Sequence, residues 1–289
     1  MSVSPRLGEK KQVQLPQGTI HYRETGEGPP IVFVHGLIVN GDLWRKLVPE
    51  LSGDFRCIAP DWPLGSHSEP MNPDANLTLP DVANIVADFL EALDLRDVTL
   101  VGNDSGGAIS QIVITTRPER IGRLVLTSCD AFEIFPPRMF KYLLLVPKLP
   151  GGMFTLAQSM RLGLARRLPI AYGALTNEPL PREISDSYAR PMFENAGVRA
   201  DVRKFLLTKD PTRYTIEAGR KLKNFDKPVL LAWDDEDRFF KYELAQRLAN
   251  EFPNAQLKRL TDARTFSAED QPQQLATMIR EFALQPAAA

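Results

Sequence analysis

The stretch Gly102-Asn103-Asp104-Ser105-Gly106 decides the fold, because it joins a buried, strand-like apolar run to a helix-like run. Glycines two residues before and two residues after a reactive side chain allow the backbone to make a strained turn from a strand into a helix. Such a turn, a nucleophile elbow, presents the central side chain to a pocket and directs the next N–H group at a developing negative charge. We therefore predict Asp104 as the reacting residue and the N–H of Ser105 as an oxyanion donor.

Two other interpretations of this turn stay open. Asp104 could be structural and cap the helix that follows it. Ser105 could be the nucleophile, although its flanking glycines would then have to lie at positions 103 and 107, and position 103 is Asn.

Strand-like and helix-like patterns alternate on both sides of the elbow, which is typical of a mainly parallel α/β sheet. Apolar residues at helical spacing predict a helix over 41–51 and another over 82–93, with Asp81 near the start of the second. Strands are predicted at 19–24, 31–35, 56–60, 98–102, 123–128, 228–233 and 256–260.

A proline-rich stretch from about 132 to 214 interrupts this alternation with short helical runs and no convincing strand. An insertion between two strands of a parallel sheet lies over the carboxyl edge of the sheet, where ligands bind. We predict a helical cap at 133–214 over a core made of 1–132 and 215–289. A set of surface helices without a role in binding is the alternative.

The composition is that of an ordinary globular chain of 289 residues with 43% hydrophobic residues. The chain has 35 basic and 36 acidic residues, which gives a net charge of −1. This balance argues against nucleic acid or an anionic membrane as a partner. No stretch reaches the roughly 20 apolar residues of a membrane helix. The N-terminus does not read as a secretory signal, and Cys57 and Cys129 are the only cysteines, so we expect a cytoplasmic protein with free thiols. We expect it to be a monomer or a homodimer.

Further candidate residues follow other predicted strands. His35-Gly36 ends one strand, so the N–H of Leu37 is the candidate second oxyanion donor. Asp237 follows the strand at 228–233, where a triad acid would lie, and Asp130 follows the strand at 123–128.

With the HG pair at 35–36, the loop Asp61-Trp-Pro-Leu-Gly, the elbow and the PVLLAW strand, the chain resembles the α/β-hydrolase family from about residue 12 to 284. Asp rather than Ser at the elbow is similar to the aspartate-nucleophile branch, the haloalkane dehalogenases and epoxide hydrolases. The resemblance implies a mainly parallel eight-stranded sheet flanked by helices, an inserted helical cap, a small organic substrate, and no metal or other cofactor.

A carboxylate nucleophile attacks carbon and leaves an alkyl ester, which a His-activated water must cleave. The resemblance places that His in the segment Asp262-Ala-Arg-Thr-Phe266, where Arg264 and Thr265 replace Gly and His. All three histidines, His21, His35 and His67, precede the elbow. Because the neighbouring Gly has changed too, the pattern favours natural divergence over a trapping mutation.

Other residues could compensate for the missing His. Asp130 could activate water. Arg264 beside Asp104 would lower the pKa of that carboxyl and bind an anionic substrate. Asp237 would then pair with Arg264 or another cation.

Residue types also test the subgroup. Ser105 stands where the resemblance to haloalkane dehalogenases implies Trp, which counts against dehalogenation, and Asn40 is close to the oxyanion loop. Epoxide hydrolases protonate the opening oxygen with cap tyrosines, for which Tyr172 and Tyr188 are the preferred candidates. The family's H-G-x-P pattern is broken at Ile38.

Three functions follow as hypotheses. The first is hydrolysis of a small, mostly apolar substrate with Asp104 as nucleophile or base. The second is a lyase, isomerase or cyclase reaction in which Asp104 moves a proton. The third is a silent ligand-binding homologue that retains the cavity.

Overall fold

A computed structural model describes residues 2–284 and contains an eight-stranded sheet of strand order β1-β2-β4-β3-β5-β6-β7-β8. The pairs β1–β2 and β2–β4 are antiparallel, and the pairs from β4 to β8 are parallel, so the predicted mainly parallel sheet is confirmed. The strands are β1 (Glu9–Leu15), β2 (Gly18–Thr25), β3 (Pro30–Val34), β4 (Arg56–Pro60), β5 (Val98–Asp104), β6 (Ile121–Cys129), β7 (Val229–Asp234) and β8 (Ala255–Leu260).

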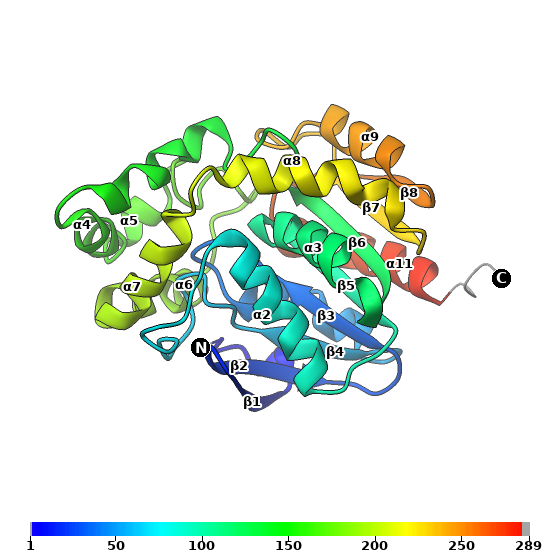
Figure 1. Cartoon of the computed structure of the whole chain (residues 1–289), viewed down its shortest axis with the longest axis horizontal. Coiled ribbons are helices and arrows are strands. Elements are labelled where there is room, and N and C mark those ends of the chain that lie inside the picture. The colour runs from blue at the N-terminus through cyan, green and yellow to red at the C-terminus, as the bar shows by residue number, and fades with distance from the viewer. Residues whose placement is uncertain (1, 285–289) are drawn as a thin grey trace.

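Helices cover both faces of this sheet. Figure 1 shows α2, α3 and α8 in front of the sheet and α11 behind it, while α4 to α7 lie to one side. The α-helices are α1 (Val48–Leu51), α2 (Leu79–Ala92), α3 (Ser105–Thr116), α4 (Gly152–Ser159), α5 (Gly163–Arg166), α6 (Arg182–Glu194), α7 (Ala196–Leu206), α8 (Pro211–Lys221), α9 (Tyr242–Glu251), α10 (Ser267–Asp270) and α11 (Pro272–Ala283). Short 3-10 helices are η1 (Pro5–Leu7), η2 (Gly41–Trp44), η3 (Pro118–Arg120), η4 (Arg138–Leu144), η5 (Val146–Lys148) and η6 (Leu222–Asn224).

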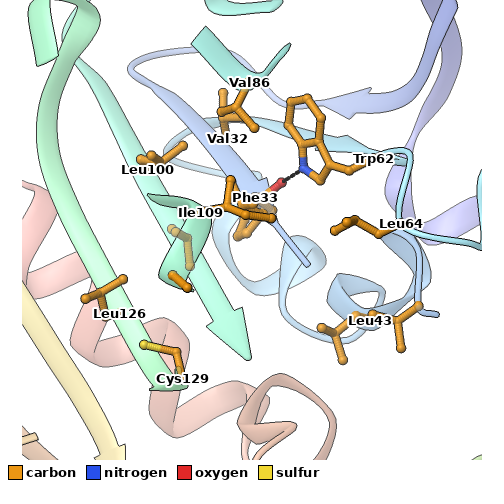
Figure 2. Packing of buried hydrophobic residues seen from close by; sticks show 14 of the residues in the cluster. Val32, Phe33, Leu43, Trp62, Leu64, Val86, Leu100, Ile109, Leu126 and Cys129 are labelled. Atoms are coloured by element: carbon orange, nitrogen blue, oxygen red, sulfur yellow. Dashed lines mark hydrogen bonds between the residues drawn. The ribbon is translucent and has the colours of Figure 1, made fainter. Parts of the chain in front are cut away.

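The central strands are buried on both faces, which explains their continuous apolar sequence. Val32 and Leu100 are register partners on β3 and β5 and are fully buried. Figure 2 shows these side chains packed with Val86 of α2, and the indole N–H of Trp62 donating to the carbonyl of Phe33. This packing holds the carboxyl ends of β3 and β5, and hence the elbow, in place.

Two elements differ from the sequence prediction. Strand β1 was missed because its residues, EKKQVQL, are mostly polar, as suits an edge strand with one neighbour and considerable exposure. The single helix predicted at 41–51 is wrong, since the chain there forms η2 and then a separate short helix, α1, with Pro49 in its first turn. Proline lacks the N–H that a continuing helix would need.

Between β6 and β7 the described chain forms helices and no named strand. Helix α8 begins at Pro211, before the predicted boundary at 214, and packs against α3 on the sheet. The division into a core and a cap stays a prediction, and we use "cap segment" for residues 133–214. Among residues 2–284 no helix is long and apolar enough to cross a bilayer.

Candidate active site

Asp104 is the last residue of β5, and α3 begins at the next residue. Its backbone has φ 54° and ψ −132°, a conformation that non-glycine residues rarely adopt. The flanking glycines permit the close approach of α3 to the sheet. A Cβ on Gly106 would overlap the carbonyl of Val34, and one on Gly107 would overlap the side chain of Cys129.

The carboxylate of Asp104 lies against two backbone donors. The N–H groups of Leu37 and Ser105 both donate to it. Gly36 leaves room for this contact, because a Cβ at that position would overlap Oδ2 of Asp104. The two predicted oxyanion donors therefore point at the carboxylate itself in this structure.

Burial dominates the electrostatics of Asp104. Desolvation raises the pKa of Asp104 to about 7, and the nearby charge of Asp237 adds to that rise, against the two backbone N–H groups. The expectation that Arg264 lowers this pKa is therefore wrong. The side chain of Arg264 instead donates to the carbonyl of Thr176, 2.7 Å away, and its backbone N–H donates to Asp270.

Asp130 is a second buried carboxyl beside the first. It is fully buried, and among the described residues neither of its carboxyl oxygens has a hydrogen-bond partner of good geometry. Desolvation and the negative charge of Asp104 raise the pKa of Asp130 well above its usual range, although the nearby hydroxyl of Ser105 opposes that rise. Two such neighbours do not readily ionise together, so the charge of each favours the protonated form of the other.

Thr265 stands where the resemblance implies His, and its hydroxyl donates to Oδ2 of Asp237 at 2.8 Å. The other oxygen of Asp237 accepts the N–H groups of Phe239 and Phe240 at 2.7 and 2.9 Å. Asp237 thus has three uncharged donors, and the predicted pairing with Arg264 is wrong. Burial still raises the pKa of Asp237.

Two further residues at the strand ends were not predicted as site residues. Asn103, directly before the nucleophile candidate, donates from Nδ2 to the carbonyl of Thr265 at 2.6 Å and to Oγ1 of Thr127 at 2.9 Å. It therefore ties the elbow to the loop that carries Thr265. Asp234 ends β7, and burial raises its pKa to about 7. Its place in the run Asp234-Asp-Glu-Asp237 was a usable signal.

A small apolar cavity of about 80 Å³ opens onto Asp104. Tyr172 lines it, and its hydroxyl donates to the carbonyl of Ile38 at 2.7 Å. Most of the lining comes from the cap segment. The lining residues are Leu37, Ile38, Asp104, Ser105, Pro136, Pro137, Phe140, Tyr142, Leu143, Leu156, Met160, Ile170, Ala171, Tyr172 and Leu175.

Ile38 has φ 54°, a value that proline cannot adopt. The replacement of the family's proline by Ile38 therefore fits the loop conformation of this chain. The N–H of Ile38 donates to the carbonyl of Leu64 at 2.8 Å, which holds the strained residue in place.

Seven of the predicted site residues do not line the cavity: Asp130, Asp237, Arg264 and Thr265, and also His35, Asn40 and Tyr188. His35 is buried, its Nε2 accepts the N–H of Trp62, and desolvation lowers its pKa to about 4. Asn40 caps η2 by accepting the N–H of Asp42. Tyr188 is fully buried behind Tyr172, with ring centroids 5.7 Å apart.

The other two histidines also lie outside the site. His67 contacts Asp201 at 3.2 Å, and His21 contacts Glu69 at 3.1 Å. Within residues 2–284 no group of three or more His, Cys, Asp and Glu side chains is arranged to hold a metal ion.

Comparisons with known proteins agree with this fold. Haloalkane dehalogenase 2 of Mycobacterium tuberculosis is 27% identical over 277 residues, which cover 94% of each chain. A cis-3-alkyl-4-alkyloxetan-2-one decarboxylase of Shewanella oneidensis is 26% identical over 274 residues, 91% of this chain and 84% of that protein. The structure of a mutant haloalkane dehalogenase from Agrobacterium tumefaciens superposes with a TM-score of 0.78 at 22% identity, covering 98% and 100% of the two chains.

The sequence model of the alpha/beta hydrolase fold family matches residues 29–272. This range contains the elbow, the oxyanion loop, the cap segment and the loop of Thr265. Together with the strand order and the position of Asp104, it shows that this chain belongs to the alpha/beta hydrolase fold family of enzymes.

Proposed function

We propose that this enzyme uses Asp104 as a nucleophile, or as a general base, on a small and mostly apolar organic substrate such as an epoxide or a haloalkane. One observation carries the proposal. The carboxylate of Asp104 stands on a strained elbow at the floor of an apolar cavity, with the N–H groups of Leu37 and Ser105 donating to it. Strain of this kind persists where the surrounding structure enforces it, and such positions cluster at active sites.

The two backbone donors suit a carboxylate nucleophile. When an oxygen of Asp104 attacks carbon, the bond to the halide or epoxide oxygen breaks and the carboxylate becomes an ester. When water then attacks the carboxyl carbon of that ester, negative charge develops on the carboxyl oxygen that faces Leu37 and Ser105. Preorganised N–H groups stabilise such a charge.

Asp130 is the candidate residue for moving protons during the formation and hydrolysis of this ester. The cavity tyrosines Tyr142 and Tyr172 each donate their hydroxyl proton to a backbone carbonyl. Asp130 has no such partner, and its raised pKa favours the protonated form beside Asp104. Asp130 does not line the cavity, so its proton would pass through the hydroxyl of Ser105, which lines the cavity and lies beside both carboxyls. One proton would leave by this route for an opening epoxide oxygen and one would return from the attacking water, which restores both carboxyls.

A second candidate function is a reaction without a hydrolysed ester. Thr265 occupies the position of the usual base and donates its proton to Asp237, so it has no capacity to activate water at neutral pH. Asp104 with a pKa of about 7 is suited to moving a proton. The Shewanella relative, whose name is that of a decarboxylase, supports this reading.

Intact-protein mass spectrometry after incubation with a panel of alkyl halides and epoxides tests the nucleophile. A stable adduct in the native protein and in Asp235→Asn, but not in Asp104→Asn, is expected if Asp104 attacks carbon. Asp235 is the matched control because it carries the same substitution on the surface, beside Arg259.

The products separate the remaining possibilities. Consumption of a compound without an adduct, with oxygen from labelled water in the product, means that hydrolysis is complete and that Asp130 is the next residue to change. A product without labelled oxygen favours the non-hydrolytic reaction. Saturable binding without turnover, unaffected by Asp104→Asn, would overturn both enzymatic proposals in favour of a ligand-binding homologue.

A further inference from the structure

The cap segment contains a stretch with an unusual distribution of charge. Residues 134–177 include six basic residues and no acidic residue, although the whole chain has a net charge of −1. The basic residues are Arg138, Lys141, Lys148, Arg161, Arg166 and Arg167. All of them except Arg166 are exposed. Although the net charge of the whole chain is near zero, the surface of this stretch is therefore strongly cationic.

The same stretch also exposes large apolar side chains. Among the described residues eleven large hydrophobic side chains are exposed, and eight of these lie between positions 139 and 170. Leu162 and Leu164 are 65% and 77% exposed. The eight residues are Met139, Leu145, Leu149, Phe154, Leu162, Leu164, Leu168 and Ile170. A concentration of exposed apolar side chains in one short stretch is typical of an interaction site.

These residues belong to one layer of the molecule. Helix α4 packs on α6 and α7, α5 packs on α6, and η5 adjoins both η4 and α4. Figure 1 shows α4 and α5 at the end of the molecule farthest from the C-terminal part of α11. We call the eight apolar residues and the five exposed basic residues of this layer the "cap outer face".

We propose that the cap outer face docks on a lipid bilayer that carries anionic headgroups. Apolar side chains interspersed with Lys and Arg, and without acidic residues, are the composition of surfaces that lie in the interface of a membrane. Leucines enter the boundary between headgroups and acyl chains, and the basic side chains remain at the level of the phosphates. Each basic residue near an anionic surface raises the partition coefficient about fivefold.

Charge argues against a second copy of the chain as the occupant. In a symmetric dimer through this face, the cationic surface would meet an identical cationic surface, and like charges placed together are unfavourable. An anionic bilayer offers the complementary charge as well as an apolar layer. The exposed acidic residues nearest to the stretch in sequence, Glu133 and Glu178, lie outside it, and Glu133 pairs with Arg247.

A second cavity, of about 460 Å³, also has a lining suited to an anionic lipid. Arg161, Arg166, Arg167 and Arg182 line it together with Leu164 and hydroxyl and amide side chains. The guanidinium of Arg166 is 3% exposed and pairs with Asp186, but among the described residues its Nε has no partner. The remaining arginines contribute positive charge at the wall. A headgroup phosphate with an adjoining acyl chain fits such a lining.

The cap outer face is continuous with the cavity above Asp104. Ile170 is 51% exposed and also lines that cavity, and Tyr172 lines both cavities. Docking would place the cavity mouth against the bilayer, so that a lipophilic substrate could reach Asp104 from the membrane. This last consequence rests on the proposed function, whereas the docking does not.

Sedimentation of the full chain with sucrose-loaded vesicles tests the docking. Binding is expected to vesicles of phosphatidylglycerol and phosphatidylcholine, to be at least tenfold weaker with phosphatidylcholine alone, and to fall in 0.5 M salt because surface charges are screened. Leu164→Glu is expected to weaken binding at least tenfold. Leu284→Glu, the same change at a 53% exposed leucine outside the cap segment, is expected to bind like the native chain.

Several outcomes would overturn the proposal. These are no binding to anionic vesicles, equal losses in the two leucine variants, or an oligomer that Leu164→Glu dissociates, since a second copy would then cover the face. Thermal melting of both variants shows whether they are folded. Asp104→Asn is expected to bind vesicles like the native chain, so a failure of the proposed chemistry is distinguishable from a failure of docking.

Discussion

At the scale of single residues, the site is defined by carboxyl groups that lack basic partners. Asp130 and Asp237 are buried and Asp104 is half-buried, and the pKa of each is raised mainly by desolvation. In the usual aspartate-nucleophile arrangement a His would share this region, whereas here Thr265 donates a hydrogen bond and accepts no proton. The chemistry of the site therefore depends on how the carboxyls share protons.

Asp104→Asn is expected to stabilise the fold at high pH. The pKa of Asp104 is raised from 3.8 to about 7, so the folded state binds the extra proton between these values. The stability from this group is complete below pH 3.8 and is lost as the pH rises to about 7. The variant is neutral at every pH, so we expect a gain of up to about 4 kcal/mol at pH 8 and little change at pH 4.

Urea unfolding at the two pH values measures this difference. Asp235→Asn should change the free energy of unfolding by less than about 0.5 kcal/mol at both. A gain for Asp104→Asn that is the same at pH 4 and pH 8 would show that the carboxyl does not titrate as the burial implies.

Thr265→Val removes the hydroxyl that donates to Asp237 while nearly conserving volume. Because the donor stabilises the charged carboxylate, its loss raises the pKa of Asp237 further. At a pH above that pKa, the loss lowers the free energy of unfolding by about 1–3 kcal/mol. The cost should be smaller at pH 5 than at pH 8, and Thr265→Ser should retain most of the stability. Chemical denaturation of the native protein, Thr265→Val and Thr265→Ser at both pH values measures these differences, and equal losses in the two variants would contradict the role of the hydroxyl.

At the scale of elements, the position of Asp104 depends on how closely α3 approaches β3. Gly106 faces the backbone carbonyl of Val34, and Gly36 faces Asp104 itself. Both contacts involve atoms that cannot move aside without shifting a strand or the carboxylate of Asp104. The elbow is therefore a property of β3, β5 and α3 together rather than of the five-residue motif.

Gly106→Ala is expected to destabilise the fold by about 2–3 kcal/mol, because the new Cβ would overlap the Val34 carbonyl. Gly53→Ala is the matched control, since a Cβ there meets no atom within 4 Å. That control should be neutral or up to about 1 kcal/mol more stable. Thermal and urea unfolding of both variants test the contrast, and equal losses would contradict the role assigned to α3 packing.

At the scale of the whole molecule, the cap segment and the sheet meet at the cavity. Tyr172, from the cap segment, donates its hydroxyl to the carbonyl of Ile38, a strained residue of the loop that carries the Leu37 N–H. Asn177 adds a second link by donating its N–H to Asp270 at 3.0 Å. The cap segment and the loop that carries Leu37 are thus connected by a hydrogen bond.

Tyr172→Phe is expected to cost about 1 kcal/mol and to loosen the loop at Ile38. Amide hydrogen exchange at 37–40 should become faster, and the KM for a cavity ligand should rise more than kcat falls. Tyr142→Phe is the control, because that hydroxyl donates to Ile170 within the cap segment. Unchanged exchange at Ile38 in the Tyr172 variant would show that the hydrogen bond does not hold the loop.

The fold and the sharp turn at Asp104 could be predicted from the sequence, because both follow from local patterns. Alternating apolar strands and helices specify a parallel sheet, and the glycines around Asp104 permit only a narrow set of turns. The edge strand β1 escaped prediction because its mostly polar sequence lacks an apolar pattern and only its pairing with β2 defines it. The helix predicted at 41–51 was wrong because the chain breaks before Pro49.

Only the tertiary structure decided the partners of the site residues. Thr265 lies 28 positions from Asp237 in the chain, and its hydrogen bond arises because two strand ends meet at one sheet edge. The side chain of Arg264 donates to the carbonyl of Thr176 in the cap segment instead of pairing with Asp237. Pairing and pKa depend on distance and desolvation across the folded chain, and no local pattern encodes them.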